Sequence, residues 1–109
     1  MNEQINLFDM LEHGLHPGDW VEQHGRELTF WEAAKRVGSL LLLDGSRTNR
    51  KELKVVRVEK CITYMDGSTL VHRIIAYDGQ RQRSLLNHMF FKDQGYTGDY
   101  PIRMYEVAG

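Results

Sequence analysis

The chain is poor in cysteine and in long apolar runs. Cys61 is its only cysteine, so neither an intrachain disulfide nor a cysteine-based metal site can form within one chain. The longest apolar run is 40–43, far below the roughly 20 residues of a membrane helix. The start of the sequence lacks the basic and apolar regions of an export signal. We therefore expect a cytoplasmic protein without a membrane span.

Neither sign of charge is in excess. Lysine and arginine total 14 against 15 aspartate and glutamate residues, so the formal net charge is -1. Overall charge therefore predicts no non-specific attraction to nucleic acid, although the balance is compatible with a local basic face. Hydrophobic residues make up 41% and charged residues 27% of the 109 residues. This composition is typical of a globular chain that is long enough for one core and too short for two.

The clearest turn signals in the chain are three Asp-Gly pairs, at 44–45, 66–67 and 78–79. Each pair follows an apolar run, and Asp-Gly in that setting is the strongest short-range indication of a β-hairpin. A two-residue turn at 66–67 would place Met65 opposite Ser68 and Val58 opposite Ile75. One face of this hairpin is then the expected core face. It carries Val56, Val58, Ile62, Tyr64, Val71, Ile75 and Tyr77.

Other strands are expected on both sides of this hairpin, at 19–24, 37–43, 81–86 and 102–107. Thr29 followed by Glu32 matches a capping box, which predicts a short helix through Arg36. An earlier helix is predicted to end at Gly14. Together these elements predict a mainly β domain with minor α content. The expected architecture is a small curved antiparallel sheet or an SH3-like barrel of five or six strands with one or two short helices.

The barrel alternative rests on one short segment. Pro17-Gly18-Asp19-Trp20-Val21 resembles the first strand of SH3-like barrels. We expect a single domain over residues 1–109, with its β-rich core in 18–107. Residues 1–14 are expected to form an N-terminal helix or a docking peptide.

The N-terminal segment Gln4-Ile5-Asn6-Leu7-Phe8 resembles the pentapeptide by which bacterial proteins dock on the replicative sliding clamp. The usual form of that peptide is Gln-Leu-Ser/Asp-Leu-Phe. Its Gln is hydrogen-bonded in one subsite, and its Leu-Phe pair fills an apolar pocket. The resemblance implies these roles for Gln4, Leu7 and Phe8. The alternative is an amphipathic helix whose apolar residues cover the core.

A basic hairpin face is the second candidate site. With a two-residue turn at 78–79, Arg57, Arg81 and Arg83 would share one outer face, and Arg73 belongs to the same hairpin. Arginine forks suit phosphate or carboxylate recognition, and curved sheets with basic faces bind single strands. The alternative is a solvated face, because edge strands carry lysine and arginine that prevent pairing between sheets.

The segment 87–101 concentrates aromatic residues among glycines. Its two adjacent phenylalanines, Phe90 and Phe91, exceed what a solvent loop requires. Such a segment either packs on the core of its own chain or forms an apolar patch for a partner. We therefore place a candidate partner or homodimer contact at Phe90 and Phe91.

No motif for catalysis or metal binding stands out. Cys61 and His72 are opposite each other in the predicted register, which is compatible with a nucleophilic pair, but a lone cysteine in a strand is usually a small apolar side chain. His13, His16 and Asp19 come nearest to a zinc site, but helix-breaking residues between them leave their spacing unfixed. Paired carboxylates and glycine-rich phosphate loops are absent. We expect a protein that is not an enzyme and has no cofactor or metal.

The whole chain also resembles small uncharacterised proteins carried on bacterial mobile elements and phages. The shared features are residues 4–9, the strand at 18–21 and the hairpin at 77–83. This resemblance implies no activity, only a setting of DNA replication or host defence. The sequence therefore leaves two hypotheses for the function. The leading hypothesis is a non-catalytic protein-binding module with a partner such as the sliding clamp, and the alternative is a nucleic-acid-binding module that uses the arginine face.

Overall fold

The structure is a computed structural model that describes residues 25–45 and 53–107. Six antiparallel strands form one sheet in the order β1-β6-β2-β3-β4-β5. The strands are β1 (Gly25–Leu28), β2 (Leu40–Asp44), β3 (Leu53–Asp66), β4 (Thr69–Tyr77), β5 (Gln82–Leu86) and β6 (Arg103–Val107). The described residues also form three short helices: α3 (Phe30–Ala34), the 3-10 helix η1 (Asn87–Met89) and α4 (Phe91–Gln94). The predicted mainly β class with minor α content is confirmed.

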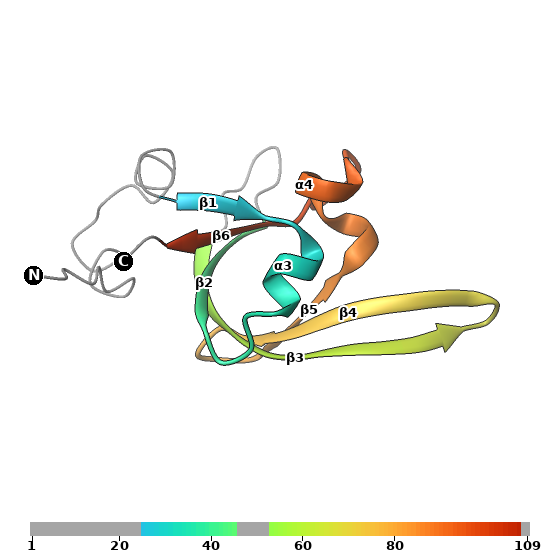
Figure 1. Cartoon of the computed structure of the whole chain (residues 1–109), viewed down its shortest axis with the longest axis horizontal. Coiled ribbons are helices and arrows are strands. Elements are labelled where there is room, and N and C mark those ends of the chain that lie inside the picture. Colours follow the sequence, from blue (N-terminus) through green and yellow to red (C-terminus); the bar gives the residue numbers. More distant parts are fainter. Residues whose placement is uncertain (1–24, 46–52, 108–109) are drawn as a thin grey trace, which may run out of the picture.

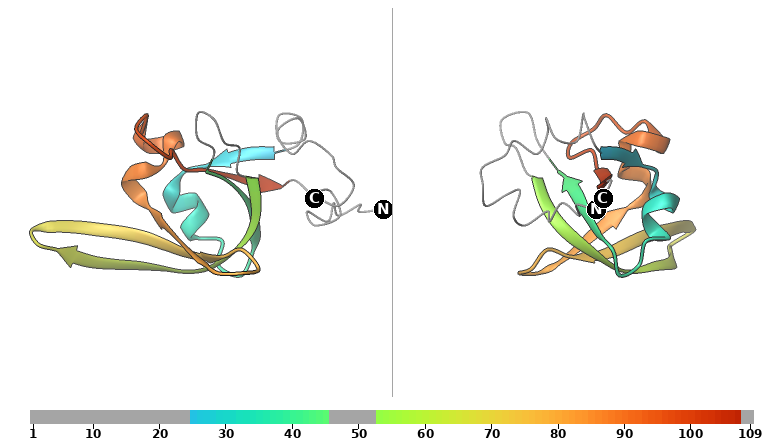
Figure 2. Two further views of the ribbon diagram at one scale, coloured as in Figure 1. Left: turned by 180° about the vertical axis from the view of Figure 1, so that it is seen from behind. Right: turned by 60° about the vertical axis from the view of Figure 1, so that its left-hand side comes forward.

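The sheet is open and strongly curved. Its two edges are β1 and β5, which do not pair with each other in the described part of the chain. The strands curl around α3, which lies on the concave side, while α4 and η1 lie beyond the end of β5 (Figures 1 and 2). Of the two predicted architectures, the curved antiparallel sheet is therefore the one observed.

The core fills the space between α3 and the concave face of the sheet. Phe30 is fully buried at its centre and meets Phe90 edge to face, with 5.2 Å between ring centroids. The strands contribute alternate residues to this cluster because successive side chains point to opposite faces. The other buried members are Leu28, Ala33, Leu41, Leu43, Val56, Val58, Ile74, Ala76, Leu85, Ile102 and Met104.

The predicted capping box at the start of α3 is confirmed. The Thr29 hydroxyl accepts a hydrogen bond from the Glu32 backbone N–H at 3.2 Å, and the Glu32 carboxylate accepts one from the Thr29 N–H at 3.0 Å. This reciprocal pair satisfies two backbone donors that a helix start leaves open. The helix ends at Ala34 rather than Arg36. It is shorter than predicted because the chain turns at Gly38, whose φ of +86° suits glycine.

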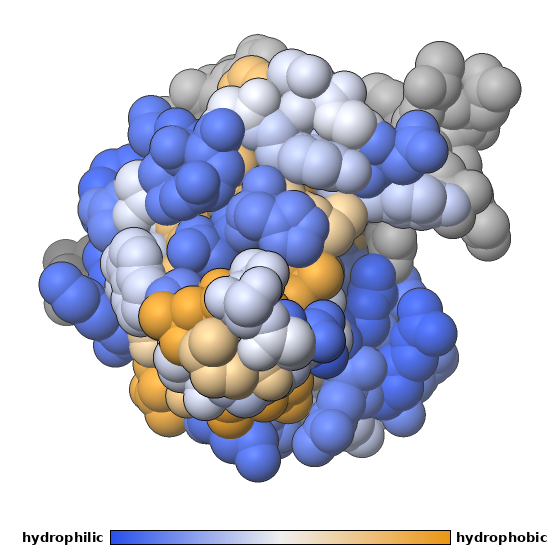
Figure 3. Space-filling model, turned by 90° about the vertical axis from the view of Figure 1, so that its right-hand side faces the viewer, coloured by the Kyte–Doolittle hydropathy of each residue, from blue (hydrophilic) through white to orange (hydrophobic). Residues whose placement is uncertain are grey.

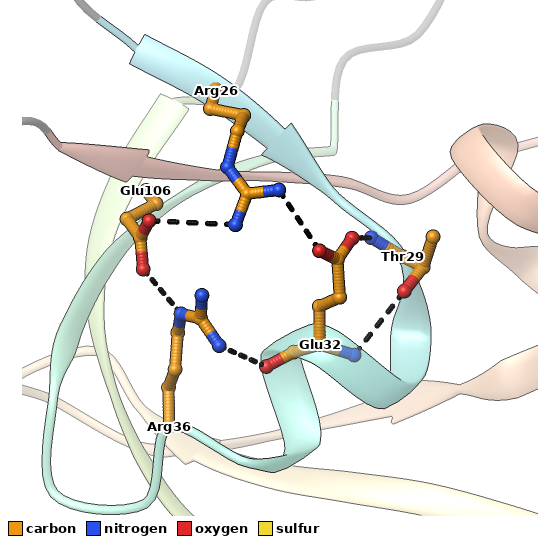
Figure 4. A network of polar contacts seen from close by, with 5 residues as sticks. All are labelled: Arg26, Thr29, Glu32, Arg36 and Glu106. Carbon is orange, nitrogen blue, oxygen red and sulfur yellow. Dashed lines mark hydrogen bonds and ion pairs between the residues drawn. The ribbon is translucent and has the colours of Figure 1, made fainter.

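A ring of ion pairs ties α3 to strands β1 and β6 (Figure 4). Arg26 lies 2.9 Å from Glu32 and 3.6 Å from Glu106, and Arg36 donates to the Glu106 carboxylate. The backbone hydrogen bond from Thr29, assisted by Arg26, lowers the pKa of Glu32 to about 2. The Arg36 side chain likewise lowers the pKa of Glu106. The Arg26–Glu32 contact is solvent-exposed and the Arg36–Glu106 contact is only partly buried, so these contacts orient the helix more than they stabilise the fold.

The remaining predicted strands are confirmed where the structure describes them. Those at 37–43, 81–86 and 102–107 are observed as β2, β5 and β6, with ends shifted by a few residues. The strand predicted at 19–24 and the helix predicted to end at Gly14 lie outside the described residues. β1 was not predicted, because Gly-Arg-Glu-Leu is short and shows no apolar alternation. Among the described residues, no helix is long and apolar enough to cross a membrane.

The predicted register of the central hairpin is wrong by two residues between its turn and Lys60, and by one residue at Val58. Asp66 pairs with Thr69, so Gly67 and Ser68 form the turn, and the φ of Gly67 is +62°. A left-handed residue at the start of the turn favours glycine there. Asp66 therefore forms the last strand pair before the turn and does not lie in the turn itself.

The predicted core face is also partly wrong, because a β-bulge interrupts β3 between Val58 and Lys60. Val58 pairs with Ala76 and Cys61 with Ile74, so Val58 and Cys61 share a face although they are three residues apart. A bulge inserts one extra residue and reverses the alternation beyond it. Val56 and Val58 do face the core, as predicted. The residues of β4 that are buried in the core with them are Ile74 and Ala76, rather than the predicted Val71, Ile75 and Tyr77.

Candidate binding arm

The far part of the β3–β4 hairpin, residues 60–72, projects beyond the rest of the sheet (Figure 1). We call it the arm. β2 pairs with β3 only as far as Arg57, and β5 pairs with β4 only from Arg73 onward. Within the described ranges, the arm therefore has no strand partner on either side. Isolated two-stranded hairpins are at best marginally stable in water, so an arm of this length needs internal contacts or a partner.

Internal contacts on both faces hold the two strands of the arm together. On one face, the Arg73 guanidinium donates to the Tyr64 hydroxyl and lies 5.3 Å from the centre of its ring. On the other face, the Thr63 hydroxyl and His72 Nδ1 are 2.9 Å apart. Trp31 of α3 meets the His72 ring edge to face at 4.9 Å. This contact connects the base of the arm to the body of the protein.

The end of the arm is apolar and exposed. Met65 and Leu70 pair directly across the two strands, and 59% and 56% of their surfaces are exposed. Seen from the end of the arm, apolar residues gather at the centre of the surface, with hydrophilic residues around them (Figure 3). Trp31, which contacts His72 of the arm, adds a 45% exposed indole. Paired large apolar side chains at a projecting tip favour contact with a partner.

A groove of about 430 Å³ runs between the arm and η1. It combines two apolar side chains, those of Leu70 and Val71, with the imidazoles of His72 and His88 and the amide of Asn87. The remaining lining residues are Asp66 and Thr69. The groove can therefore offer both hydrogen bonds and an apolar contact to a segment that lies beside the arm.

Sequence reasoning did not single out this arm as a site. Met65 and Leu70 directly flank the 66–69 turn, and two large apolar residues beside a hairpin turn are the signal that could have identified it. What the pattern does not show is that the neighbouring strands end before the arm does. The length of the arm depends on where β2 begins beside β3 and where β5 ends beside β4.

The four candidate arginines do not share one face. Arg57 pairs with Tyr77, and Arg83 pairs with Ala76. Tyr77 and Ala76 are adjacent in β4 and point to opposite faces, so the side chains of Arg57 and Arg83 project on opposite sides of the sheet. The prediction of a common outer face for them is therefore wrong, because the second hairpin also closes two residues later than expected. Arg81 precedes β5 in the turn and is exposed.

Several of these arginines have acidic or aromatic contacts nearby. Arg83 lies 3.4 Å from the Asp78 carboxylate, and Arg57 lies 3.9 Å from Glu59. Arg73 stacks on Tyr64 at the base of the arm. Carboxylates beside Arg57 and Arg83 reduce the positive potential that each presents to a phosphate.

The turn that follows β4 is organised by Asp78. Its carboxylate accepts hydrogen bonds from the backbone N–H groups of Gln80 and Arg81, each at 2.9 Å. Lys54 and Arg83 lie 3.5 and 3.4 Å from the same carboxylate. The two backbone donors, with Arg83 and Lys54 in support, lower the pKa of Asp78 well below its ordinary range. Asp78 therefore acts as a fixed anion that shapes the turn.

Phe90 and Phe91 are placed in different environments. Phe90 is fully buried against Phe30, so it contributes to the core and is not accessible to a partner. Phe91 is 37% exposed, with the Arg103 guanidinium 4.1 Å from the centre of its ring. Of the two predicted contact residues, Phe91 is the one that lies at the surface. Gln4, Leu7 and Phe8 lie outside the described residues.

The predicted pairing of Cys61 with His72 is also wrong, because the register of the hairpin differs from the predicted one. Cys61 pairs with Ile74 and His72 with Thr63, so cysteine and histidine are not directly opposite each other as predicted. Burial raises the pKa of the Cys61 thiol, which disfavours the reactive thiolate. In the described part of the chain, no three His, Cys, Asp or Glu residues come together as metal ligands. His13, His16 and Asp19 are not among the described residues.

Comparison of the chain with protein family models, curated proteins and solved structures gives no match. The function proposed below therefore rests on the geometry of the arm.

Proposed function

We propose that this chain is a non-catalytic protein-binding module that engages its partner with the β3–β4 arm. The observation that carries this proposal is the exposed Met65–Leu70 pair at the end of the arm, which has no strand partner on either side in the described ranges. Free strand edges add a partner strand through main-chain hydrogen bonds, and apolar side chains beside them supply affinity. Burying two large apolar side chains on a partner would release their surface from water.

Nucleic-acid binding through the arginine face is the weaker candidate. Its premise was a shared basic surface, and the observed register puts Arg57 and Arg83 on opposite sides of the sheet. A phosphate-driven interaction would also weaken steeply as salt rises, whereas an apolar arm contact would not. Binding measured between about 50 and 200 mM salt therefore separates the two candidates.

We predict that Met65→Glu/Leu70→Lys abolishes partner capture by the purified protein from a lysate of its own cell. The two new charges are opposite in sign, so they do not repel each other across the arm. The matched control is Val37→Lys, because Val37 is 58% exposed and lies in the turn before β2. Both variants are expected to melt like the wild type. Equal loss of capture in the control, or full capture by the arm variant, would contradict the proposal.

We also propose that the segment from Gln4 to Phe8 docks on a bacterial sliding clamp, as its sequence resemblance implies, in a mobile-element or phage setting. Phe8→Ala is expected to abolish binding to purified clamp, because the phenylalanine ring would fill the apolar pocket. The variant Met65→Glu/Leu70→Lys should bind the clamp normally. Unchanged clamp binding by Phe8→Ala would rule out this docking mode, and it would leave the arm proposal unaffected.

A further inference from the structure

The free edge of β3 in the arm has a defined hydrogen-bonding pattern. Asp66 and Thr69 close a two-residue turn, and the pair that flanks such a turn exchanges both of its hydrogen bonds. The bonded pairs then alternate along the ladder, so the backbone groups of Tyr64 and Ile62 also point toward β4. The backbone N–H and C=O groups of Met65, Thr63 and Cys61 point the other way, toward the free edge.

The charges on this edge strand are arranged symmetrically. Lys60 and Asp66 project from the same face of β3, each three residues from Thr63. Both side chains are exposed, and within the described residues neither has an ion-pair partner. An antiparallel neighbour related by a two-fold axis at Thr63 would therefore place an opposite charge beside each of them.

We propose that the arm binds the arm of a second copy of this chain through antiparallel β3–β3 pairing centred on Thr63. This inference rests on the proposed arm-binding function and names the partner. Thr63 faces Thr63 of the second copy, and Lys60 faces its Asp66. Because the interface is isologous, the Asp66–Lys60 contact occurs twice. The two sheets then join into one continuous sheet across the dimer.

Hydrogen bonding alone would also permit centres at Ile62 or Tyr64. A centre at Ile62 places Lys60 opposite Tyr64 of the second copy, and a centre at Tyr64 places Lys60 opposite Ser68, which lies in the turn of that copy. Of these centres, Thr63 is the one that sets Lys60 opposite Asp66, so charge selects the register. It also sets Met65 beside Cys61 and Tyr64 beside Ile62, which covers part of the exposed apolar tip.

Charge reversal tests both the dimer and its register. Lys60→Glu and Asp66→Lys each create two like-charge contacts, so each variant alone should dimerise at least about tenfold more weakly. An equimolar mixture should regain wild-type dimerisation, because every contact in the mixed dimer is again between opposite charges. Sedimentation velocity over a concentration series measures all three samples. Lys35→Glu, an exposed reversal at the end of α3, is the control and should remain like the wild type.

A crosslink provides a second measurement that does not depend on charge. In a Cys61→Ser background, Thr63→Cys should form an intersubunit disulfide on oxidation, since paired residues of adjacent strands lie about 5.5 Å apart. Thr69→Cys in the same background, on the β4 side of the turn, should not. A monomer at all concentrations, or no recovery in the mixture, would overturn the inference. If capture of another protein still depends on Met65 and Leu70 in that case, the proposed function stands and only the second copy is excluded.

Discussion

Replacing Phe90 by alanine is expected to destabilise the fold by about 3–5 kcal/mol. Phe90 is fully buried and meets Phe30 edge to face at the centre of the core. Its removal loses apolar burial and leaves a cavity that the surrounding strands fill only in part. The free energy of unfolding, measured by urea denaturation with tryptophan fluorescence, gives the change directly.

Phe91→Ala is the matched control for this prediction. Phe91 is the next residue in the sequence, but it is 37% exposed and its main described contact is the Arg103 guanidinium. We expect a loss below about 1 kcal/mol, the usual magnitude of an exposed cation–π contact. Similar losses for the two variants would contradict the assignment of Phe90 to the core and Phe91 to the surface.

Asp78→Ala is expected to cost about 1–2 kcal/mol. The Asp78 carboxylate accepts two backbone hydrogen bonds in the turn after β4, and both are lost with the side chain. Asp78→Asn keeps an oxygen that can accept these bonds but removes the negative charge beside Lys54 and Arg83. It should therefore cost less than the alanine variant at neutral pH. An asparagine variant as unstable as the alanine variant would assign the effect to charge alone.

The pH dependence of this site has a definite sign. The folded pKa of Asp78 lies well below that of the unfolded chain, so the folded state holds the proton less tightly. The stabilisation by the charge is therefore fully present above the unfolded pKa of about 4, and it is lost as the pH falls toward the folded pKa. The stability difference between wild type and Asp78→Asn should be constant near neutral pH and shrink below about pH 4. A difference that grows on acidification would contradict this account.

The features that short-range chemistry controls were predictable from the sequence. Thr29 and Glu32 are close enough in sequence to cap the same helix start, and the structure shows both of their hydrogen bonds. The Asp-Gly pair at 66–67 correctly marked a hairpin between apolar runs. Its register was predicted wrongly because both Asp66 and Gly67 were placed inside the turn, whereas only glycine is needed at the position with positive φ.

The composition, the Asp-Gly pairs and the capping box thus determined by themselves that this chain is mainly β and contains a central hairpin. Only the tertiary structure decided which side of that hairpin is buried. The bulge beyond Val58 puts Cys61 on the same face as Val58, and this face carries the buried Ile74 and Ala76 of β4. The arm was likewise decided in three dimensions. It is free because β2 begins and β5 ends at the base of the arm, and the relative lengths of separate strands depend on how the whole sheet curves around its core.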